Sequence, residues 1–337
     1  MQPPRRQRLT DIALQDGAML SGEVARRRVL GRLRSRDDLF RQVTWSAAVG
    51  VLVLLGGVIA SLVQGAIPAF RTFGLGFLVS QRWNPVTEVF GALPAIYGTV
   101  VTSFIAILIA VPVGVMIAFF LTELCPNWLR RPIGIAVELL AGIPSIIYGI
   151  WGLFVFAPFL QQTLQPFLID TLGELPLIGA LFGGPPYGIG MLTASLILGI
   201  MILPFISSIS RDVFEAVPTV LKEAAYGIGC TRWEVMRHVV LPYARTGVVG
   251  AIMLALGRAL GETMAVTFVI GNAHRISPSL LAPATTISAT IANEFTEAVG
   301  ELYPSALIAT GLILFVITFS VLAVARYLLL RIERRIG

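Results

Sequence analysis

The sequence predicts an all-α, polytopic membrane protein with about six transmembrane helices. The chain of 337 residues is 56% hydrophobic and only 13% charged, and its mean hydropathy is +0.83. A soluble domain has no means of burying so much apolar surface, so the bilayer is the expected solvent. Six apolar runs are also long enough to cross the hydrocarbon core. Their expected ranges are 43–67, 96–122, 138–160, 188–210, 246–271 and 304–327.

Prolines interrupt the third and fourth of these ranges, at Pro144, Pro158 and Pro204. Membrane helices tolerate proline where neighbouring helices satisfy the freed backbone groups. Proline also marks broken helices that line a solute path. We expect tolerated prolines here, and broken helices remain the alternative.

The distribution of basic residues predicts the orientation in the membrane. If the N-terminus is cytosolic, 21 basic residues fall in cytosolic segments, and only Arg71, Arg82 and Arg275 fall in outer ones. Cytosolic loops of membrane proteins carry an excess of Lys and Arg. Both termini are therefore expected in the cytosol.

The N-terminal segment 1–42 is predicted to be an arginine-rich cytosolic extension, and 43–337 to be the transmembrane domain. The extension carries ten arginines and five acidic residues. It is too long and polar for a signal peptide, and the apolar run that follows has spanning length. Its arginines favour a flexible tail near anionic lipid, with a regulatory arm as the alternative. Without an aromatic and basic platform, nothing indicates nucleic-acid binding.

A polar insert at about 211–245 separates the fourth and fifth spans. Thr231 is followed three residues later by Glu234, which is the spacing of a capping box. Pro242 is expected to end the helix that begins there. Four apolar residues recur on one face of this helix: Trp233, Met236, Val239 and Val240. Because so short a helix is marginal alone in water, we expect a partner protein to cover that face, with lipid headgroups as the alternative.

Two opposite charges lie near the middle of the fifth span, Arg258 and Glu262. A charge at the bilayer centre costs about 2.5–3.5 kcal/mol on insertion scales. Residues four apart share one helix face, so the two are expected to pair, and Gly257 and Gly261 beside them allow close approach of a helix or a solute. Such a pair either locks helices together or lines a path in which the guanidinium binds an oxyanion and Glu262 weakens that grip. Buried ion pairs stabilise proteins poorly, which favours the path.

Other chemistry is not indicated by these 337 residues. They contain no GxxxxGK[ST] phosphate loop, and their single lysine is Lys222. Cys125 and Cys230 suggest neither a disulfide nor a zinc site. We expect a protein that is not an enzyme and has no cofactor of its own.

The predicted outer loops, 161–187 and 272–303, are candidate contacts for an external partner or ordinary solvated loops. The second contains His274 and Glu294 among its polar residues. We find no tandem repeat of the kind that favours an inverted-repeat secondary transporter.

The insert resembles the EAA loop of ATP-binding-cassette (ABC) importer permeases. Six positions match that signature and Val239 replaces its isoleucine; the matching residues are Glu223, Ala224, Ala225, Gly229, Leu241 and Pro242. Three further segments resemble phosphate importer permeases of the PstC type: FGALPAIYGTVVTS at 90–103, GIPSIIYGIWGLFVF at 142–156 and GRALGETMAV at 257–266. The resemblance covers nearly all of the chain from the first span onward, but not the arginine-rich extension.

This resemblance implies a type I ABC importer permease fold and the role of permease subunit in an ATP-driven phosphate importer of the bacterial inner membrane. It implies that Arg258 and Glu262 serve phosphate passage and that the EAA loop docks on an ATPase. The expected partners are a PstA-type permease, a PstB-type ATPase dimer that uses ATP and Mg, and a PstS-type phosphate-binding protein. A permease for sulfate or molybdate, a proton-coupled secondary anion transporter that uses Glu262, and a structural scaffold remain alternatives.

Overall fold

The computed structural model of the chain describes residues 5–333 except residue 177. Within these residues the regular structure is helical, and extended pairing is limited to two isolated bridges. Six helical stretches are long and apolar enough to cross a membrane, which confirms the expected number. Their bounds are Asp38–Phe73, Leu93–Leu124, Ser145–Leu172, Met191–Glu215, Arg232–Gly261 and Leu302–Arg331.

The individual helices follow in chain order. They are α1 (Arg5–Phe73), α2 (Gly76–Val79), α3 (Leu93–Phe119), the π-helix η1 (Phe120–Leu124), α4 (Asn127–Ala141), α5 (Ser145–Trp151), the π-helix η2 (Gly152–Phe156), α6 (Ala157–Gln162), α7 (Leu164–Leu172), α8 (Gly179–Phe182), α9 (Met191–Glu215), α10 (Thr219–Gly227), α11 (Arg232–Val235), the π-helix η3 (Met236–Val240), α12 (Leu241–Gly261), α13 (Met264–Val269), α14 (Ile287–Glu294) and α15 (Leu302–Glu333).

The chain divides into two compact units, 1–61 and 62–337. Helix α1 begins at Arg5 and continues through the first span, so the expected boundary at residue 42 is a change in composition and not the start of a helix. In the second unit, the hydroxyl of Ser305 links the last part of α1 to α15. It donates to the Gly65 carbonyl (2.7 Å) and accepts from the Ala69 amide (3.0 Å).

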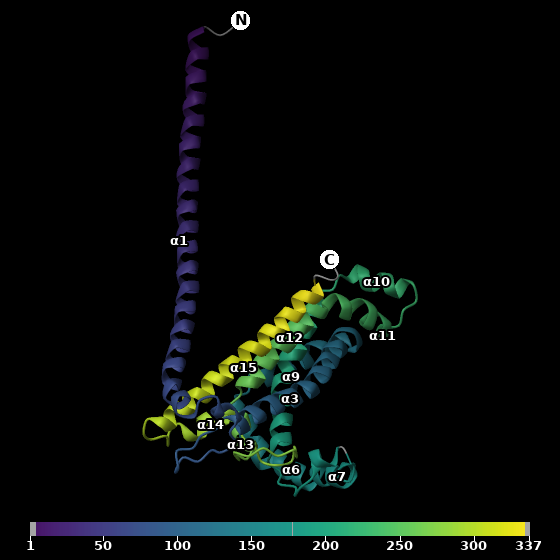
Figure 1. Cartoon of the computed structure of the whole chain (residues 1–337). Helices are drawn as coiled ribbons and strands as arrows, with labels where there is room; N and C mark the ends of the chain where they lie inside the picture. Colours follow the sequence, from purple (N-terminus) through teal and green to yellow (C-terminus); the bar gives the residue numbers. More distant parts are fainter. Residues whose placement is uncertain (1–4, 177, 334–337) are drawn as a thin grey trace. The chain divides into compact units, whose positions relative to one another are not determined.

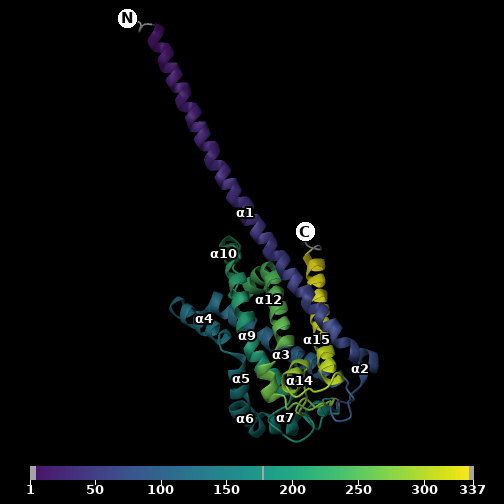
Figure 2. The same ribbon diagram turned by 90° about the vertical axis from the view of Figure 1, so that its left-hand side faces the viewer.

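Four long helices form the centre of the second unit. Helices α3, α9, α12 and α15 run side by side between two ends of the unit (Figure 1), with the most extensive packing between α3 and α9. Helices α10 and α11 lie at one end, and α6, α7 and α14 lie at the other (Figures 1 and 2). Between the central helices, small side chains such as Ala106, Ala194 and Ala255 are fully buried. Close approach of membrane helices requires small residues at the contact.

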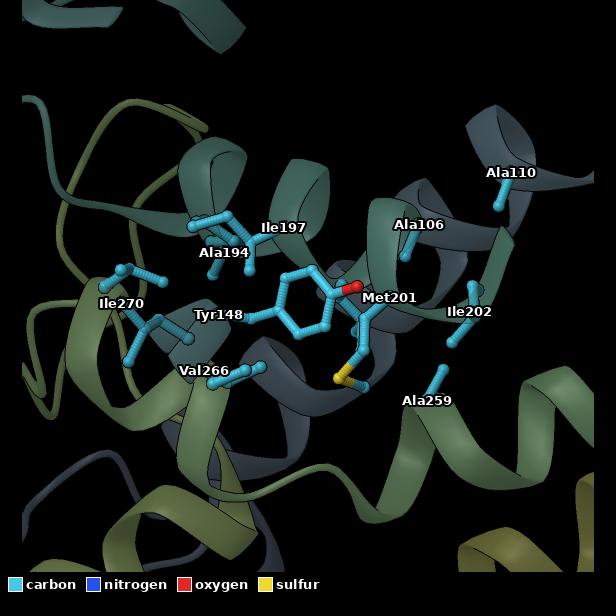
Figure 3. Packing of buried hydrophobic residues seen from close by; sticks show 14 of the residues in the cluster. Ala106, Ala110, Tyr148, Ala194, Ile197, Met201, Ile202, Ala259, Val266 and Ile270 are labelled. Carbon is cyan, nitrogen blue, oxygen red and sulfur yellow. The ribbon is translucent and has the colours of Figure 1, made fainter. Parts of the chain in front are cut away.

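The main core cluster includes an aromatic side chain from the third span, Tyr148. The ring of Tyr148 lies among Ala194, Ile197 and Met201 of α9 and Val266 of α13 (Figure 3). Its hydroxyl donates a hydrogen bond to the Leu140 carbonyl at 2.8 Å. The buried phenol therefore has the polar partner that burial requires.

The expected third span, 138–160, is wrong in its position. Helix α4 ends at Ala141, and a new helix begins at Ser145 and continues with π-helical and irregular turns to Leu172. The break falls at Pro144, because proline lacks an amide hydrogen and disfavours a helical conformation in the residue before it. Pro204, in contrast, lies inside an unbroken α9, so one proline interrupts its segment and the other is tolerated, as expected for it.

The fifth span also differs from the expected range, 246–271. The helix begins earlier, at Arg232, and ends at Gly261. Glu262 then adopts an extended conformation (φ −67°, ψ 130°) before α13 starts at Met264. The membrane segment that carries Arg258 and Glu262 is therefore a broken helix.

The predicted outer loops contain helices. Helices α7 and α8 occupy part of 161–187, and α14 occupies part of 272–303. The Thr286 hydroxyl caps α14 by accepting a hydrogen bond from the Ala289 amide (3.2 Å), which satisfies one of the free amides at the start of a helix.

Candidate functional site

Arg258 lies in the last turn of α12, directly before the break in the fifth span. Its side chain is exposed in this chain, and its guanidinium carbon lies 4.6 Å from the centre of the Phe205 ring on α9. A cation over an aromatic face at this distance is attracted by the ring quadrupole. The aromatic ring supports the guanidinium without occupying its hydrogen-bond donors.

Glu262 does not pair with Arg258, so the expected ion pair is wrong. Among the residues that the structure describes, no carboxylate oxygen lies within 4.0 Å of the Arg258 guanidinium. The physical reason is the helix break, because the shared face of residues four apart exists only in a continuous helix. Glu262 Oε1 instead accepts a hydrogen bond from the Ala265 amide at 3.3 Å, which satisfies a free amide in the first turn of α13.

The two glycines beside Arg258 have different surroundings. A methyl group at Gly257 would lie 3.6 Å from Leu322 of α15, whereas one at Gly261 would meet no atom within 4 Å. The expected close approach of another helix therefore applies to Gly257. At Gly261 the space next to the break is open.

The EAA residues lie on several elements at the α10 end of the unit. Glu223 and Ala224 are exposed on α10, and Ala225 on the same helix is buried. Gly229 follows α10 with φ of +93°, a left-handed conformation that glycine adopts without steric strain. The remaining positions, Val239, Leu241 and Pro242, lie on the long helix that begins at Arg232.

The expected capping box is confirmed. The Glu234 amide donates to Thr231 Oγ1 (3.3 Å), and the Thr231 amide donates to Glu234 Oε2 (2.7 Å). The expected end of the helix at Pro242 is wrong, because the chain continues as α12. The π-helical turn of η3 precedes Pro242 and shifts the hydrogen-bond pattern, so the missing amide of proline falls in the first turn of α12, where it is tolerated.

The apolar face expected on the helix after Thr231 packs largely within this chain. Met236 and Val240 are buried in a cluster with Phe119 of α3 and Phe214 of α9. The surface that remains open is instead on and next to α10, where Val220 is 70% exposed and Ile228 is 84% exposed. Sequence reasoning missed this surface, although two apolar residues beside the Glu-Ala-Ala triplet were a visible signal.

A polar cluster that sequence reasoning also missed lies at the α14 end of the unit. Glu294 Oε2 accepts hydrogen bonds from Trp83 Nε1 (2.6 Å) and the Tyr303 hydroxyl (2.7 Å), and Glu294 Oε1 lies 2.8 Å from His274 Nε2. The His274 and Trp83 rings are stacked. Burial alone raises the pKa of Glu294, but the hydrogen bonds from His274, Tyr303 and Trp83 outweigh it and hold that pKa below its ordinary value. The cluster joins four separate parts of the chain through these contacts.

The family of proteins described as "Binding-protein-dependent transport system inner membrane component" matches residues 110–334. The chain belongs to this family. It is therefore a multi-pass membrane protein and a transport component rather than a catalytic one, and it works in a complex with other subunits.

Individual relatives extend the similarity to nearly the whole chain. The "Phosphate transport system permease protein PstC" of Mesorhizobium japonicum is 70% identical over 306 residues, which cover 91% of this chain and 94% of the relative. The protein of the same name from Pasteurella multocida is 58% identical over 299 residues, with 89% and 93% coverage.

A solved structure supports the fold independently. A chain from the crystal structure of a bacterial alginate ABC transporter, in complex with an alginate pentasaccharide-bound periplasmic protein, superposes with a TM-score of 0.60 at 19% identity. The superposition covers 88% of this chain and 96% of the other. It confirms the expected ABC importer permease fold.

Proposed function

We propose that this chain is the permease subunit of an ATP-driven phosphate importer, in which Arg258 is the cation that phosphate passes. The observation that carries this proposal is the position of Arg258 at a break in a membrane helix, with no carboxylate partner among the residues that the structure describes. Charged residues inside spans mark solute pathways, and broken helices are typical of binding sites at membrane depth. The names of the relatives, which are phosphate permeases, support the choice of solute.

Arg258 suits this role because of its chemistry. A guanidinium presents its donors in a planar fork that matches two oxygens of an oxyanion. The ring of Phe205 holds that fork in place from one side. Glu262 lies four residues further on at the break, and its negative charge limits how tightly an anion is held near it. Weak binding of this kind allows release, which a transport path requires.

The coupling role falls to the exposed part of α10. Glu223, Ala224 and Val220 on α10 and Ile228 just after it form a surface that the described residues leave exposed. We assign this surface to an ATPase subunit, as the EAA resemblance implies. Ala225, Val239, Leu241 and Pro242 then hold α10 and the following helix in position, and Gly229 forms the turn between them.

The complete importer would contain a PstA-type permease, a PstB-type ATPase dimer and a PstS-type phosphate-binding protein in a bacterial inner membrane. ATP and Mg would act in the ATPase and not in this chain. With both termini cytosolic, as the basic residues indicate, α10 would face the ATPase and α14 the binding protein.

Purification and transport together test the proposal. The tagged chain should copurify with the three partner types, and the complex in proteoliposomes should take up labelled phosphate only with ATP on the ATPase side. Uptake of sulfate or molybdate in place of phosphate would contradict the assigned solute. Uptake by this chain alone, driven by a pH gradient, would contradict the importer and favour a secondary transporter.

Substitution of Gly229 by valine should separate ATP hydrolysis from phosphate uptake. The Cβ of a valine would meet no neighbouring atom, but φ of +93° is strained for a β-branched residue by roughly 1–3 kcal/mol. The turn after α10 should therefore shift, and phosphate uptake should fall by roughly tenfold while the ATPase still hydrolyses ATP. Gly227, which also has open space but a helical φ, provides the control as Gly227→Ala. Wild-type uptake by Gly229→Val would remove the turn from the coupling role.

A further inference from the structure

Glu123, at the end of the second span, holds the coupling loop through several contacts. Its Oε1 accepts a hydrogen bond from Lys222 Nζ at 2.7 Å, and its Oε2 accepts one from the Tyr226 hydroxyl at 3.4 Å. Both partners lie on α10. The Glu123 backbone carbonyl accepts a further hydrogen bond from Arg232 at 3.0 Å. Lys222 also donates to the Phe214 carbonyl of α9 at 3.3 Å. We call this set of contacts the Glu123 clasp.

The clasp is more protected than the other carboxylate contacts at this end of the molecule. The side chains of Lys222 and Glu123 are 16% and 11% exposed, whereas Glu138, which pairs with Arg211 at the same distance of 2.7 Å, is 47% exposed. A protected ion pair is screened little by water, and loss of one partner leaves the other charge buried without compensation. The ion pair between Lys222 and Glu123 should therefore stay intact when α10 is displaced.

The carboxylate belongs to a π-helical turn that continues α3. Glu123 lies in η1, which follows α3 without interruption, so Leu93–Leu124 forms one helical stretch of 32 residues. At 1.5 Å per residue this stretch is about 48 Å long. Among the described helices, α3 also makes its most extensive packing contact with α9.

The other end of α3 contacts the segment before α14. The Thr99 hydroxyl accepts a hydrogen bond from the Ile287 amide at 2.9 Å, and the Tyr97 hydroxyl donates to the Ser277 carbonyl at 3.1 Å. Helix α3 therefore joins the coupling loop at one end of the unit to the 277–287 segment at the other. A packed helix with fixed contacts at both ends is a physical route for a displacement.

We propose that Glu123 is the positioning residue through which movement of α10 reaches α3. This inference rests on the proposed function, because it assumes that the ATPase moves α10. In it, Lys222 and Tyr226 transmit the movement to the carboxylate, and the Arg232 contact keeps the two helices of the coupling loop together. Glu123 would therefore act through Lys222 and Tyr226.

A double-mutant cycle in the reconstituted importer tests the clasp. Glu123→Gln should lower the maximal rate of phosphate uptake by roughly tenfold, with KM for phosphate within about twofold of wild type, because the solute path itself is intact. More ATP should be hydrolysed per phosphate imported. Lys222→Gln should act similarly, and the double variant should be no worse than either single one. Additive effects, or a wild-type ratio of ATP to phosphate, would overturn the proposal.

Hydrogen exchange in the full complex, without phosphate, supplies a readout that does not depend on the solute. Amides of 219–227 should exchange roughly tenfold faster in Glu123→Gln, because the local opening of α10 loses its anchor. Glu123→Asp keeps the charge on a shorter side chain and should retain part of the protection, and Glu138→Gln is the matched control that should leave these amides unchanged. Equal exchange in wild type and Glu123→Gln would overturn the clasp, as would an Asp variant no better protected than the Gln one. A wild-type complex that fails to import phosphate would overturn the proposed function alone, since the exchange comparison does not use phosphate.

Discussion

Replacement of Arg258 by glutamine should reduce phosphate uptake by roughly 100-fold or more while leaving the complex assembled. The substitution removes the positive charge and the guanidinium fork, and charge-assisted hydrogen bonds of this kind are about twice as strong as neutral ones. A loss of about 2.7 kcal/mol at the point of passage corresponds to about 100-fold in rate. Uptake of labelled phosphate by the reconstituted importer measures the effect, and copurification of the partners measures assembly.

The structure explains why assembly should survive this substitution. Arg258 is exposed in the isolated chain and has no carboxylate partner among the described residues, so its loss leaves no opposite charge buried. The contact with Phe205 is the interaction that it gives up, and an exposed cation–π contact contributes about 0.5–1 kcal/mol. Loss of Arg258 is therefore expected to reduce transport while leaving the stability of the complex nearly unchanged.

Two further variants show whether the charge or the fork matters. Arg258→Lys keeps the charge without the planar donors, so intermediate uptake would indicate that the fork itself contributes. Arg245→Gln is the matched control, because Arg245 lies on the same helix, thirteen residues earlier and about 20 Å away. Wild-type uptake by Arg258→Gln, or an equal loss in Arg245→Gln, would place Arg258 outside the path.

Much of this architecture could be predicted from composition and local signals. Apolar runs of spanning length predicted six membrane helices, and Thr231 with Glu234 predicted the start of the helix after α10, because both signals are local in the sequence. Breaks in membrane helices were harder to place. Pro144 interrupts its segment while Pro204 does not, and the difference depends on which neighbouring helices satisfy the backbone, which a single segment does not reveal.

Contacts between distant segments account for what was missed at the site. The pairing of Arg258 with Glu262 assumed a continuous helix. The end of that helix at Gly261 was not predicted from the segment GRALGETMAV. The Glu123 clasp joins residues about a hundred positions apart. The available signal was Lys222, the single lysine in a chain that has 24 arginines. Its partner Glu123 is identified only when the structure brings the end of the second span next to α10.

Substitution of Gly98 by alanine should lower the stability of the protein more than a methyl group added at any of the other glycines considered above. Gly98 lies on α3 where the helix meets the backbone of the 277–287 segment, and an added Cβ would overlap the Thr285 carbonyl oxygen. Overpacking of a tight contact costs typically 1–3 kcal/mol. Separation of the two backbones would also stretch the adjacent hydrogen bond from the Ile287 amide to the Thr99 hydroxyl, which contributes about 0.5–1.5 kcal/mol. The thermal unfolding midpoint should fall by roughly 5–15 °C.

Gly250→Ala is the matched control for this measurement. Gly250 lies inside α12, and a Cβ at this position would meet no atom within 4 Å. Alanine is favoured over glycine in a helix interior by up to about 1 kcal/mol, so the control should unfold at the wild-type temperature or slightly above it. Because the two substitutions add the same methyl group to long membrane helices, the difference between their midpoints isolates the contact with Thr285. An unchanged midpoint for Gly98→Ala would mean that the 277–287 segment moves away from α3 without loss, and α3 would then no longer be a rigid connection between the two ends of the permease.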